Sequence, residues 1–502
     1  MNLNNNLLKT SVLILTLIVL GKITGFLKDV VLTYYHGVSA ITDAFFLSSS
    51  IATVIYMAVF LSIPVVLVPI LMKSIQSSGS VYSHSAFRLL VVFAVISLVF
   101  SVGVWFGAEQ LVGFFSGELG SVTTELATAY LSIMSVTFFL STAVSFFNSV
   151  QISQKNTLPS YATPIVNNSI FILSIFIFSQ YSEFHIVLMF GIFSWFLLLI
   201  ANVRSVSGYF NRKYFNKDSL NGLIKSSFIM LPAILSIYIE QVNTTISIFF
   251  ATEVGDGAVT TMFYGNKLNT LFLSVFIVIL TTVIFPRIAE QISKNKVKEL
   301  KNNLHMYLKV ILLIGLPFAY LMSIFSEQFI SLIFERGSFT KHDVVNVSAV
   351  FSVLIFGLIM SLIRDLVNRV YFAYKKTMHV FYITTFSVLI NFILSLAWYQ
   401  DFGLLGLSYA SVASLVFNVL ISLYFLSVLM KQPILILTIR IFLSLSFSVV
   451  LSYACFYFLS VVGVSVTWAF LISFFAYLGF IYINQFRGAW LELNFRNGKK
   501  RI

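Results

Sequence analysis

Long, uninterrupted apolar blocks constrain this chain more than any other feature of its sequence. Of its 502 residues, 59% are hydrophobic and 10% are charged. Soluble domains carry about 25% charged residues, so a water-soluble fold would lack polar surface. Many blocks reach about 18 residues or more, the length that a helix needs to cross a hydrocarbon core of ~30 Å. The alternating strands of a membrane β-barrel are absent from the sequence. We therefore predict an all-α polytopic membrane protein.

The apolar blocks predict about 14 transmembrane helices. Their centres lie near residues 20, 58, 97, 137, 170, 196, 235, 273, 315, 358, 388, 416, 446 and 474. Basic residues concentrate in the even-numbered loops and the tail, whereas most odd-numbered loops carry acidic residues. Under the positive-inside rule, this alternation places both termini in the cytoplasm. The net charge of +13 is then a topology signal that suits anionic membrane lipid, and it does not predict nucleic-acid binding.

The order of the helices divides the chain into three predicted parts. Residues 1–210 form an N-terminal lobe of helices 1–6, and residues 211–431 form a C-terminal lobe of helices 7–12. Residues 432–502 add two helices and a basic cytoplasmic tail. Paired six-helix halves usually place a substrate site at their interface, near the middle of the membrane.

Charged residues inside the predicted helices are the candidates for that site. Lys22, Lys28 and Asp29 lie in the first helix, and Lys267 begins the corresponding helix of the second lobe. A charge deep in the bilayer costs about 2.5–3.5 kcal/mol, so such residues normally face a cavity or a partner. An ammonium patch would bind an anion such as a diphosphate, and Gly25 would let a helix or a headgroup approach closely. In the structural alternative, Asp29 neutralises one lysine, another reaches the membrane surface, and Lys267 is an exposed helix end.

Other polar residues inside apolar runs predict coupling or structural roles. Glu240 lies near Asn243, where a carboxylate would carry a proton or help to bind Na⁺; the alternative is a hydrated group at the outer interface. Asp365 and Arg369 are spaced for a structural ion pair along one helix. No HExxH, P-loop or G-x-S-x-G motif occurs, and neither the histidines nor Cys455 show metal-ligand spacing. We expect no enzyme activity, no metal and no cofactor other than a coupling Na⁺ or H⁺.

Four segments are similar to those of a known family: LGKITGFLKDVVLTYYHGVSAITDAFFLS, NSVQISQKNTLPSYATPIVNNS, FYGNKLNTLFLSVFIVILTTVIFPRIAE and LIFERGSFTKHD. They resemble the MurJ (MviN) lipid II flippases of the multidrug/oligosaccharidyl-lipid/polysaccharide exporter superfamily. The resemblance implies two six-helix lobes in a V around a cationic central cavity, plus two C-terminal helices. It implies alternating access that carries a lipid-linked anionic glycan to the outer leaflet of the bacterial cytoplasmic membrane. It also implies that Lys22, Lys28 and Lys267 stand where the family has arginines, and that Asp43 belongs to the substrate site.

The chain departs from this family at its charged positions, which keeps other functions open. Three lysines replace arginines and lose bidentate phosphate recognition, and the second helix lacks the arginines of the family. The alternatives are a flippase for another lipid-linked polysaccharide unit, a cation-coupled multidrug exporter of the same superfamily, and a non-transporting cell-wall scaffold. A drug exporter would favour intramembrane carboxylates, and a scaffold would need no buried cations. The sequence does not determine the oligomeric state.

Overall fold

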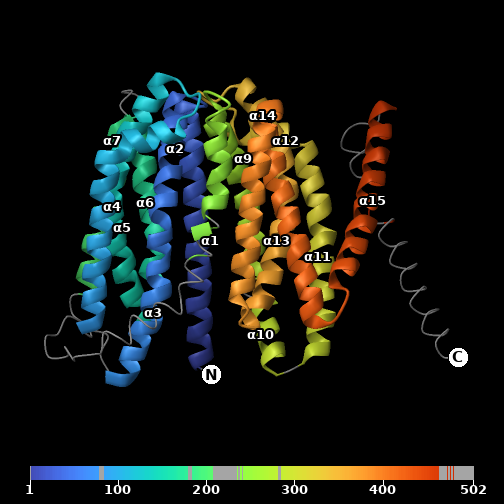
Figure 1. Ribbon diagram of the computed structural model, residues 1–502, viewed down its shortest axis with the longest axis horizontal. Coiled ribbons are helices and arrows are strands. Elements are labelled where there is room, and N and C mark those ends of the chain that lie inside the picture. The colour runs from blue at the N-terminus through green and yellow to red at the C-terminus, as the bar shows by residue number, and fades with distance from the viewer. Residues whose placement is uncertain are drawn as a thin grey trace, which may run out of the picture. The chain divides into compact units, whose positions relative to one another are not determined.

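The computed structural model shows an all-α protein (Figure 1). It describes residues 2–78, 84–178, 184–206, 235, 238–239, 241–280, 284–294, 296–462, 472, 475, 477 and 479. These residues form helices and turns and contain no strand. Among them, 8 helices are long and apolar enough to cross a membrane. The predicted fold class is therefore confirmed, whereas the number of fourteen spans stays a prediction.

The chain as far as residue 206 folds into a bundle around one central helix, α5. The elements are α1 (Asn2–His36), α2 (Ala40–Ala52), the π-helical turn η1 (Thr53–Met57), α3 (Ala58–Ser78), α4 (His84–Phe115), α5 (Ser121–Ser153), α6 (Leu158–Phe178) and α7 (Phe184–Val206). Helix α5 contacts α2, α3, α4, α6 and α7. Several of its buried hydroxyl groups bond within their own helix: Ser141 donates to the carbonyl of Thr137 at 2.6 Å, and Ser149 to that of Ser145 at 2.7 Å. Small side chains with satisfied hydroxyls let membrane helices approach closely, which explains the central place of α5.

The second part of the chain is also helical. Residues 241–250 are helical, followed by α9 (Ala258–Ile279), α10 (Phe285–Ser293), α11 (Val297–Ile324), α12 (Ser326–Phe334), α13 (Lys341–Ala373), α14 (Thr377–Met430) and α15 (Ile434–Val461). Helix α14 contains two of the predicted spans, which meet at Gly403 with φ 54° and ψ −133°. Glycine accepts this positive φ without steric cost, so the chain changes direction there without a loop.

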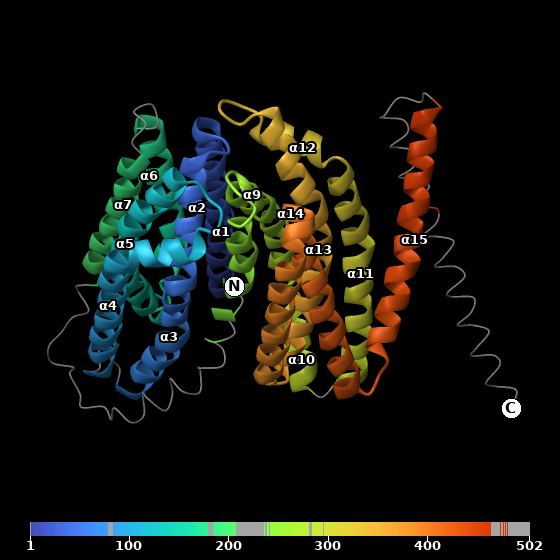
Figure 2. The same ribbon diagram turned by 45° about the horizontal axis from the view of Figure 1, so that its top comes forward.

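Two compact units make up the protein. The first contains Met1–Leu271, Ser326–Leu354 and Thr377–Ser414, and the second contains Phe272–Phe325, Ile355–Lys376 and Leu415–Ile502. Helices α1–α7 of the first unit lie side by side in both views (Figures 1 and 2). The predicted boundary between residues 210 and 211 lies outside the described residues, so the three-part division stays a prediction.

Candidate substrate site

A shared carboxylate joins α1 to α9 within the first unit. The side chain of Asp29 is 1% exposed; its Oδ1 lies 3.5 Å from Lys28 Nζ, and its Oδ2 lies 3.0 Å from Lys267 Nζ. The side chains of Lys28 and Lys267 are 20% and 35% exposed. The two lysines therefore remain accessible while the carboxylate between them is buried. We call Lys28, Asp29 and Lys267 the Asp29 cluster.

Lys22 adds a third positive charge to this region. It lies exposed on α1, between one and two turns before Lys28. No ion pair for Lys22 is found within the described residues. Lys22 and Lys267 are close enough to repel each other electrostatically. Lys22 and the Asp29 cluster together hold three ammonium groups and one carboxylate, so a formal excess of two positive charges is available to an anion.

Aromatic rings surround the two paired lysines. Lys28 Nζ lies 5.3 Å from the ring centroid of Phe171 and 5.9 Å from that of Phe45. Lys267 Nζ lies 5.6 Å from the ring centroid of Phe263, on its own helix. Contacts of this kind stabilise a partly desolvated ammonium by about 0.5–2 kcal/mol. Phe45 and Phe263 lie in segments that resemble those of the family, whereas the sequence carried no signal for Phe171.

Gly25 permits a close approach, and the neighbour is α6. A Cβ atom at Gly25 would lie 3.3 Å from Nδ2 of Asn168. That amide group donates to the carbonyl of Gly21 and to Oγ1 of Thr24, each at 3.4 Å. Asn168, which the sequence did not single out, thus ties α6 to the part of α1 that carries Lys22. Gly25 was predicted to permit the close approach of a helix or of a headgroup, and the structure shows the approach of a helix.

Asp43 has a different set of partners and caps α9. Its Oδ1 accepts hydrogen bonds from the backbone N–H of Thr260 (2.8 Å) and from the Thr260 hydroxyl (2.5 Å), and its Oδ2 accepts one from the backbone N–H of Gly257. These N–H groups have no partner within the helix, and the helix dipole favours a negative charge there. Asp43 therefore links α2 to α9 as a helix cap, and its contact with substrate stays a prediction.

Asp256 makes the same kind of contact in the opposite direction. It lies in the turn before α9, and its Oδ1 accepts hydrogen bonds from the backbone N–H of Gly120 (3.2 Å) and from the hydroxyl of Thr123 (3.1 Å). Both donors belong to the start of α5. Each part of the chain thus supplies a carboxylate that caps a helix of the other part. We call these contacts of Asp43 and Asp256 the capping seam.

The turn before α13 extends the capping seam to the end of α1. The backbone N–H of Ser338 donates to the carbonyl of Tyr34 at 2.8 Å, and the Ser338 hydroxyl donates to the carbonyl of Tyr35 at 2.9 Å. Gly337 has a φ of +62°, and a Cβ atom there would lie 2.1 Å from the carbonyl oxygen of Tyr34. Only glycine permits this approach.

The predicted ion-coupling residue Asn243 is hydrogen-bonded to α14. Asn391 Nδ2 donates to Asn243 Oδ1 at 3.0 Å, and the hydroxyl oxygens of Ser247 and Ser411 lie 2.8 Å apart. Glu240, the other predicted coupling residue, lies outside the described residues, so an ion-coupling role stays a prediction. No group of three or more His, Cys, Asp or Glu side chains suited to a metal occurs in the part of the chain that the structure describes.

The predicted ion pair on α13 lies in the second unit. Asp365 Oδ1 is 3.3 Å from Nη2 of its neighbour Arg364. The guanidinium group of Arg369 lies 5.6 Å from the ring centroid of Phe285 on α10. The structure thus shows Asp365 paired with Arg364, and a pair between Asp365 and Arg369 stays a prediction.

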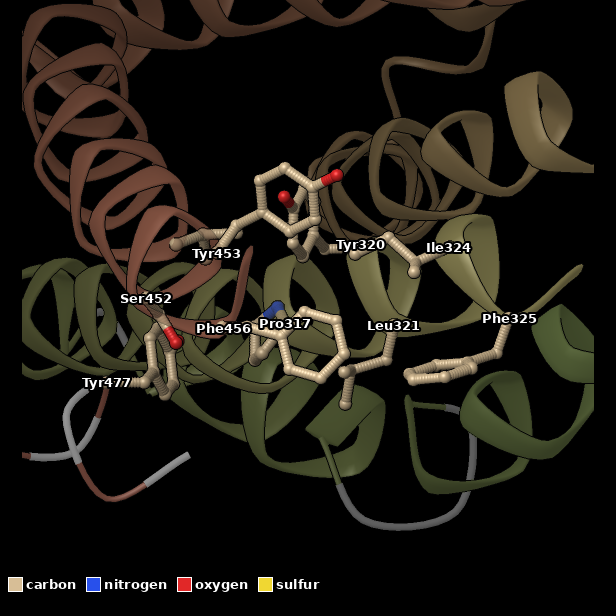
Figure 3. Close-up of a pocket in the computed structure, with 10 residues that line it drawn as sticks. Pro317, Tyr320, Leu321, Ile324, Phe325, Ser452, Tyr453, Phe456 and Tyr477 are labelled. Carbon is tan, nitrogen blue, oxygen red and sulfur yellow. The ribbon is translucent and has the colours of Figure 1, made fainter. Parts of the chain in front are cut away.

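An aromatic pocket lies in the second unit between α11 and α15 (Figure 3). Pro317, Tyr320, Phe325, Tyr453 and Phe456 line it, and the rings of Tyr320 and Tyr453 meet edge to face with their centroids 5.4 Å apart. None of the described lining residues carries a charge. This lining suits a hydrocarbon chain rather than a charged headgroup.

Comparisons with known proteins point to one family. The family model for "Lipid II flippase MurJ" matches residues 32–482. A probable lipid II flippase MurJ of Borreliella burgdorferi is 25% identical over 470 residues, covering 89% of this chain and 88% of that relative. The protein of the same name from Buchnera aphidicola is 24% identical over 389 residues, covering 73% of each chain.

Solved structures share the fold. A structure described as lipid II flippase MurJ in an inward closed conformation matches with a TM-score of 0.76 at 20% identity, covering 94% of this chain and 98% of that one. An inward-facing multidrug resistance MATE family transporter matches with a TM-score of 0.66 at 15% identity, covering 82% and 96%. The family model spans most of the sequence, and the apolar helices are those of a multi-pass membrane protein. The chain therefore belongs to the lipid II flippase MurJ family.

Proposed function

We propose that the protein flips a polyprenyl-diphosphate-linked glycan of the lipid II type from the inner to the outer leaflet of the bacterial cytoplasmic membrane. One observation carries the proposal: two lysines, Lys28 on α1 and Lys267 on α9, share the buried carboxylate of Asp29, and Lys22 adds a third ammonium group near them. Membership of the lipid II flippase family supports it. Both chain termini lie in the cytoplasm in this proposal, because the basic loops then face inward.

The phosphates of the substrate replace Asp29 as the partner of the lysines. A lysine is a compact point charge on a flexible stem, so Lys28 and Lys267 can turn from the carboxylate to a phosphate without movement of the backbone. Lys22 makes the first contact with the phosphates, because it does not have to leave a carboxylate first. The nearby phenylalanine rings keep each ammonium close to its present position during the exchange.

Transport follows by alternating access. The capping seam holds one end of the bundle closed, so substrate enters from the other end, and opening of the seam releases it. With the cell interior negative, outward movement of anionic charge gains about 2.3 kcal/mol per charge per 100 mV. The lipid chain remains in the apolar interior of the bilayer during this movement. A coupling Na⁺ or H⁺ near Asn243 is a further element of the proposal.

A second candidate substrate is another polyprenyl-diphosphate-linked polysaccharide unit. The observation that favours it is chemical: lysines bind phosphate without the bidentate geometry that guanidinium groups provide. The two candidates differ only in the glycan. Parallel flipping assays with lipid II and with a second polyprenyl-diphosphate glycan distinguish them, since a lipid II flippase transports the first faster.

The experiment that tests the proposal neutralises the three lysines. We expect Lys22→Gln, Lys28→Gln and Lys267→Gln each to lower the rate of lipid II flipping in proteoliposomes by about 10-fold or more, because each removes a charge-assisted contact. The triple variant is expected to show no flipping above empty liposomes. Wild-type flipping by the triple variant, at equal protein abundance, contradicts the proposal.

Lys294→Gln is the matched control. Lys294 also has a carboxylate partner, with its Nζ 2.6 Å from Glu290 Oε1, but its side chain is 59% exposed. The hydrogen bond from Lys294 holds the pKa of Glu290 below its ordinary value. We expect Lys294→Gln to flip substrate at the wild-type rate, since an exposed pair contributes little.

A further inference from the structure

A polar cavity lies beside the capping seam, in the first unit. Its volume is about 420 Å³, within the range of about 300–1,000 Å³ that is usual for small-molecule sites. Its polar lining comes from Ser39, Asp256, Thr261, His342, Asp343 and Asn346. Neither the proposed transport step nor the Asp29 cluster uses this cavity.

The walls of the cavity come from both parts of the chain. Ser39 precedes α2, Thr261 lies in the first turn of α9, and His342 and Asp343 lie in the first turn of α13. Asp256 contributes to the cavity and also caps α5 as part of the capping seam. The cavity therefore exists in this form only while the seam is closed.

The charged side chains of the lining are two carboxylates, and His342, Asn346 and apolar residues lie beside them. Asp256 and Asp343 are carboxylates, and each has one oxygen bound by protein donors: Asp256 Oδ1 by Gly120 and Thr123, and Asp343 Oδ2 by Thr340, whose backbone N–H and hydroxyl lie at 2.8 and 2.9 Å. The Thr261 hydroxyl donates to the carbonyl of Gly257, which turns its oxygen into an acceptor for a ligand. A ligand that satisfies this lining is rich in donors and positively charged.

We propose that this cavity binds an amine-bearing sugar and that its occupancy holds the capping seam closed. The ammonium group lies between Asp256 and Asp343, and the ring hydroxyls donate to the remaining acceptors. A ligand that binds only the closed seam shifts the protein toward that state, by about 11-fold at a concentration of ten times its dissociation constant. For its effect on transport, though not for binding, this inference rests on the proposed function.

The test measures binding and seam closure separately on the purified full-length protein. Glucosamine is the probe, and N-acetylglucosamine, which has the same ring but no positive charge, is its control. We expect glucosamine to bind at least about 10-fold more tightly than N-acetylglucosamine, since a charge-assisted contact is lost in the latter. Spin labels at Glu125 on α5 and Gln400 on α14, both exposed, report the seam. Glucosamine is expected to narrow the distribution of distances between the two labels and to shift it toward shorter distances.

Variants assign the effect to the cavity. We expect Asp343→Asn to weaken glucosamine binding by about 10-fold and Thr261→Val to weaken it a few-fold. Asp401→Asn, which removes an exposed carboxylate elsewhere on α14, is expected to leave binding unchanged. Two variants are used because Asp343 also bonds to Thr340, whereas Thr261→Val leaves that contact in place.

Three results would overturn the inference: equal binding of both sugars, wild-type affinity in both cavity variants, or binding without any change in the spin-label distances. Binding and closure without slower flipping of lipid II would instead count against the proposed function, because a closed seam must slow transport through it.

Discussion

Asp29 and Asp43 are buried carboxylates on successive helices, and their partners are of opposite kinds. Both residues are 0% exposed. Asp29 is held by two side-chain ammonium groups, at 3.5 and 3.0 Å. Asp43 is held by two backbone N–H groups and one hydroxyl at the start of α9. Burial alone therefore does not tell what a membrane carboxylate does.

The difference lies in what can move. A lysine side chain changes its rotamer freely, so the partners of Asp29 can leave one anion for another. Backbone N–H groups are fixed by their helix, so the partners of Asp43 leave only if α9 moves as a body. The first arrangement suits exchange with a ligand, and the second suits a joint between two parts of the chain. Three substitutions test this contrast, in order of expected effect.

Asp29→Asn is expected to have the largest effect on stability. It leaves Lys28 and Lys267 without a countercharge, and breaking a buried pair costs about 3–5 kcal/mol. Because both lysine side chains are partly exposed, we expect the lower end, a loss of about 3 kcal/mol in the free energy of unfolding. Denaturant titration in detergent measures it. The double variant Asp29→Asn/Lys267→Gln should recover part of the loss; no recovery would mean that Asp29 acts through other groups.

Asp43→Asn is expected to have an intermediate effect, confined to the seam. The asparagine keeps one acceptor oxygen but turns an NH₂ group toward a backbone N–H, which costs about 1–2 kcal/mol. We expect a longer distance population between spin labels at Glu125 and Gln400 than in the wild type. Asp401→Asn serves as the control with an exposed carboxylate. An unchanged distance distribution would show that the Asp43 cap does not hold the seam.

Asp256→Asn is expected to have the smallest effect. Asp256 is exposed, and its two hydrogen bonds are longer, at 3.2 and 3.1 Å. The asparagine oxygen can keep both, so we expect a loss below about 1 kcal/mol and a smaller shift of the same label distance. If Asp256→Asn opened the seam as far as Asp43→Asn, burial of the carboxylate would not be what makes the Asp43 cap strong.

The sequence predicted much of this protein from local properties alone. Apolar length predicted membrane helices, and the helices of the structure agree in type. The high cost of burying charge marked Lys22, Lys28, Asp29 and Lys267 for attention before any of their partners was known. Motif order pointed to the family that the family model then matched over residues 32–482.

Other features depended on which helices meet. Gly403 joins two predicted spans into α14 without a loop, because one glycine with a positive φ can turn the chain. Asn168 and Phe171 are distant in sequence from the part of α1 that they contact. An asparagine or a phenylalanine in an apolar run looks the same in the sequence whether it faces lipid or a lysine. The TDAFF segment itself does not indicate that its aspartate, Asp43, caps α9, a helix more than two hundred residues later in the chain.

The sequence by itself determined that this chain crosses a membrane and carries charge inside it, since hydropathy and charge are properties of each residue and its neighbours. Only the tertiary structure decided that Asp29 is shared between two lysines whereas Asp43 is fixed to a helix end. The physical reason is that a charge in a low-dielectric interior is defined by its partner, and the partner is chosen by the packing of helices far apart in the chain.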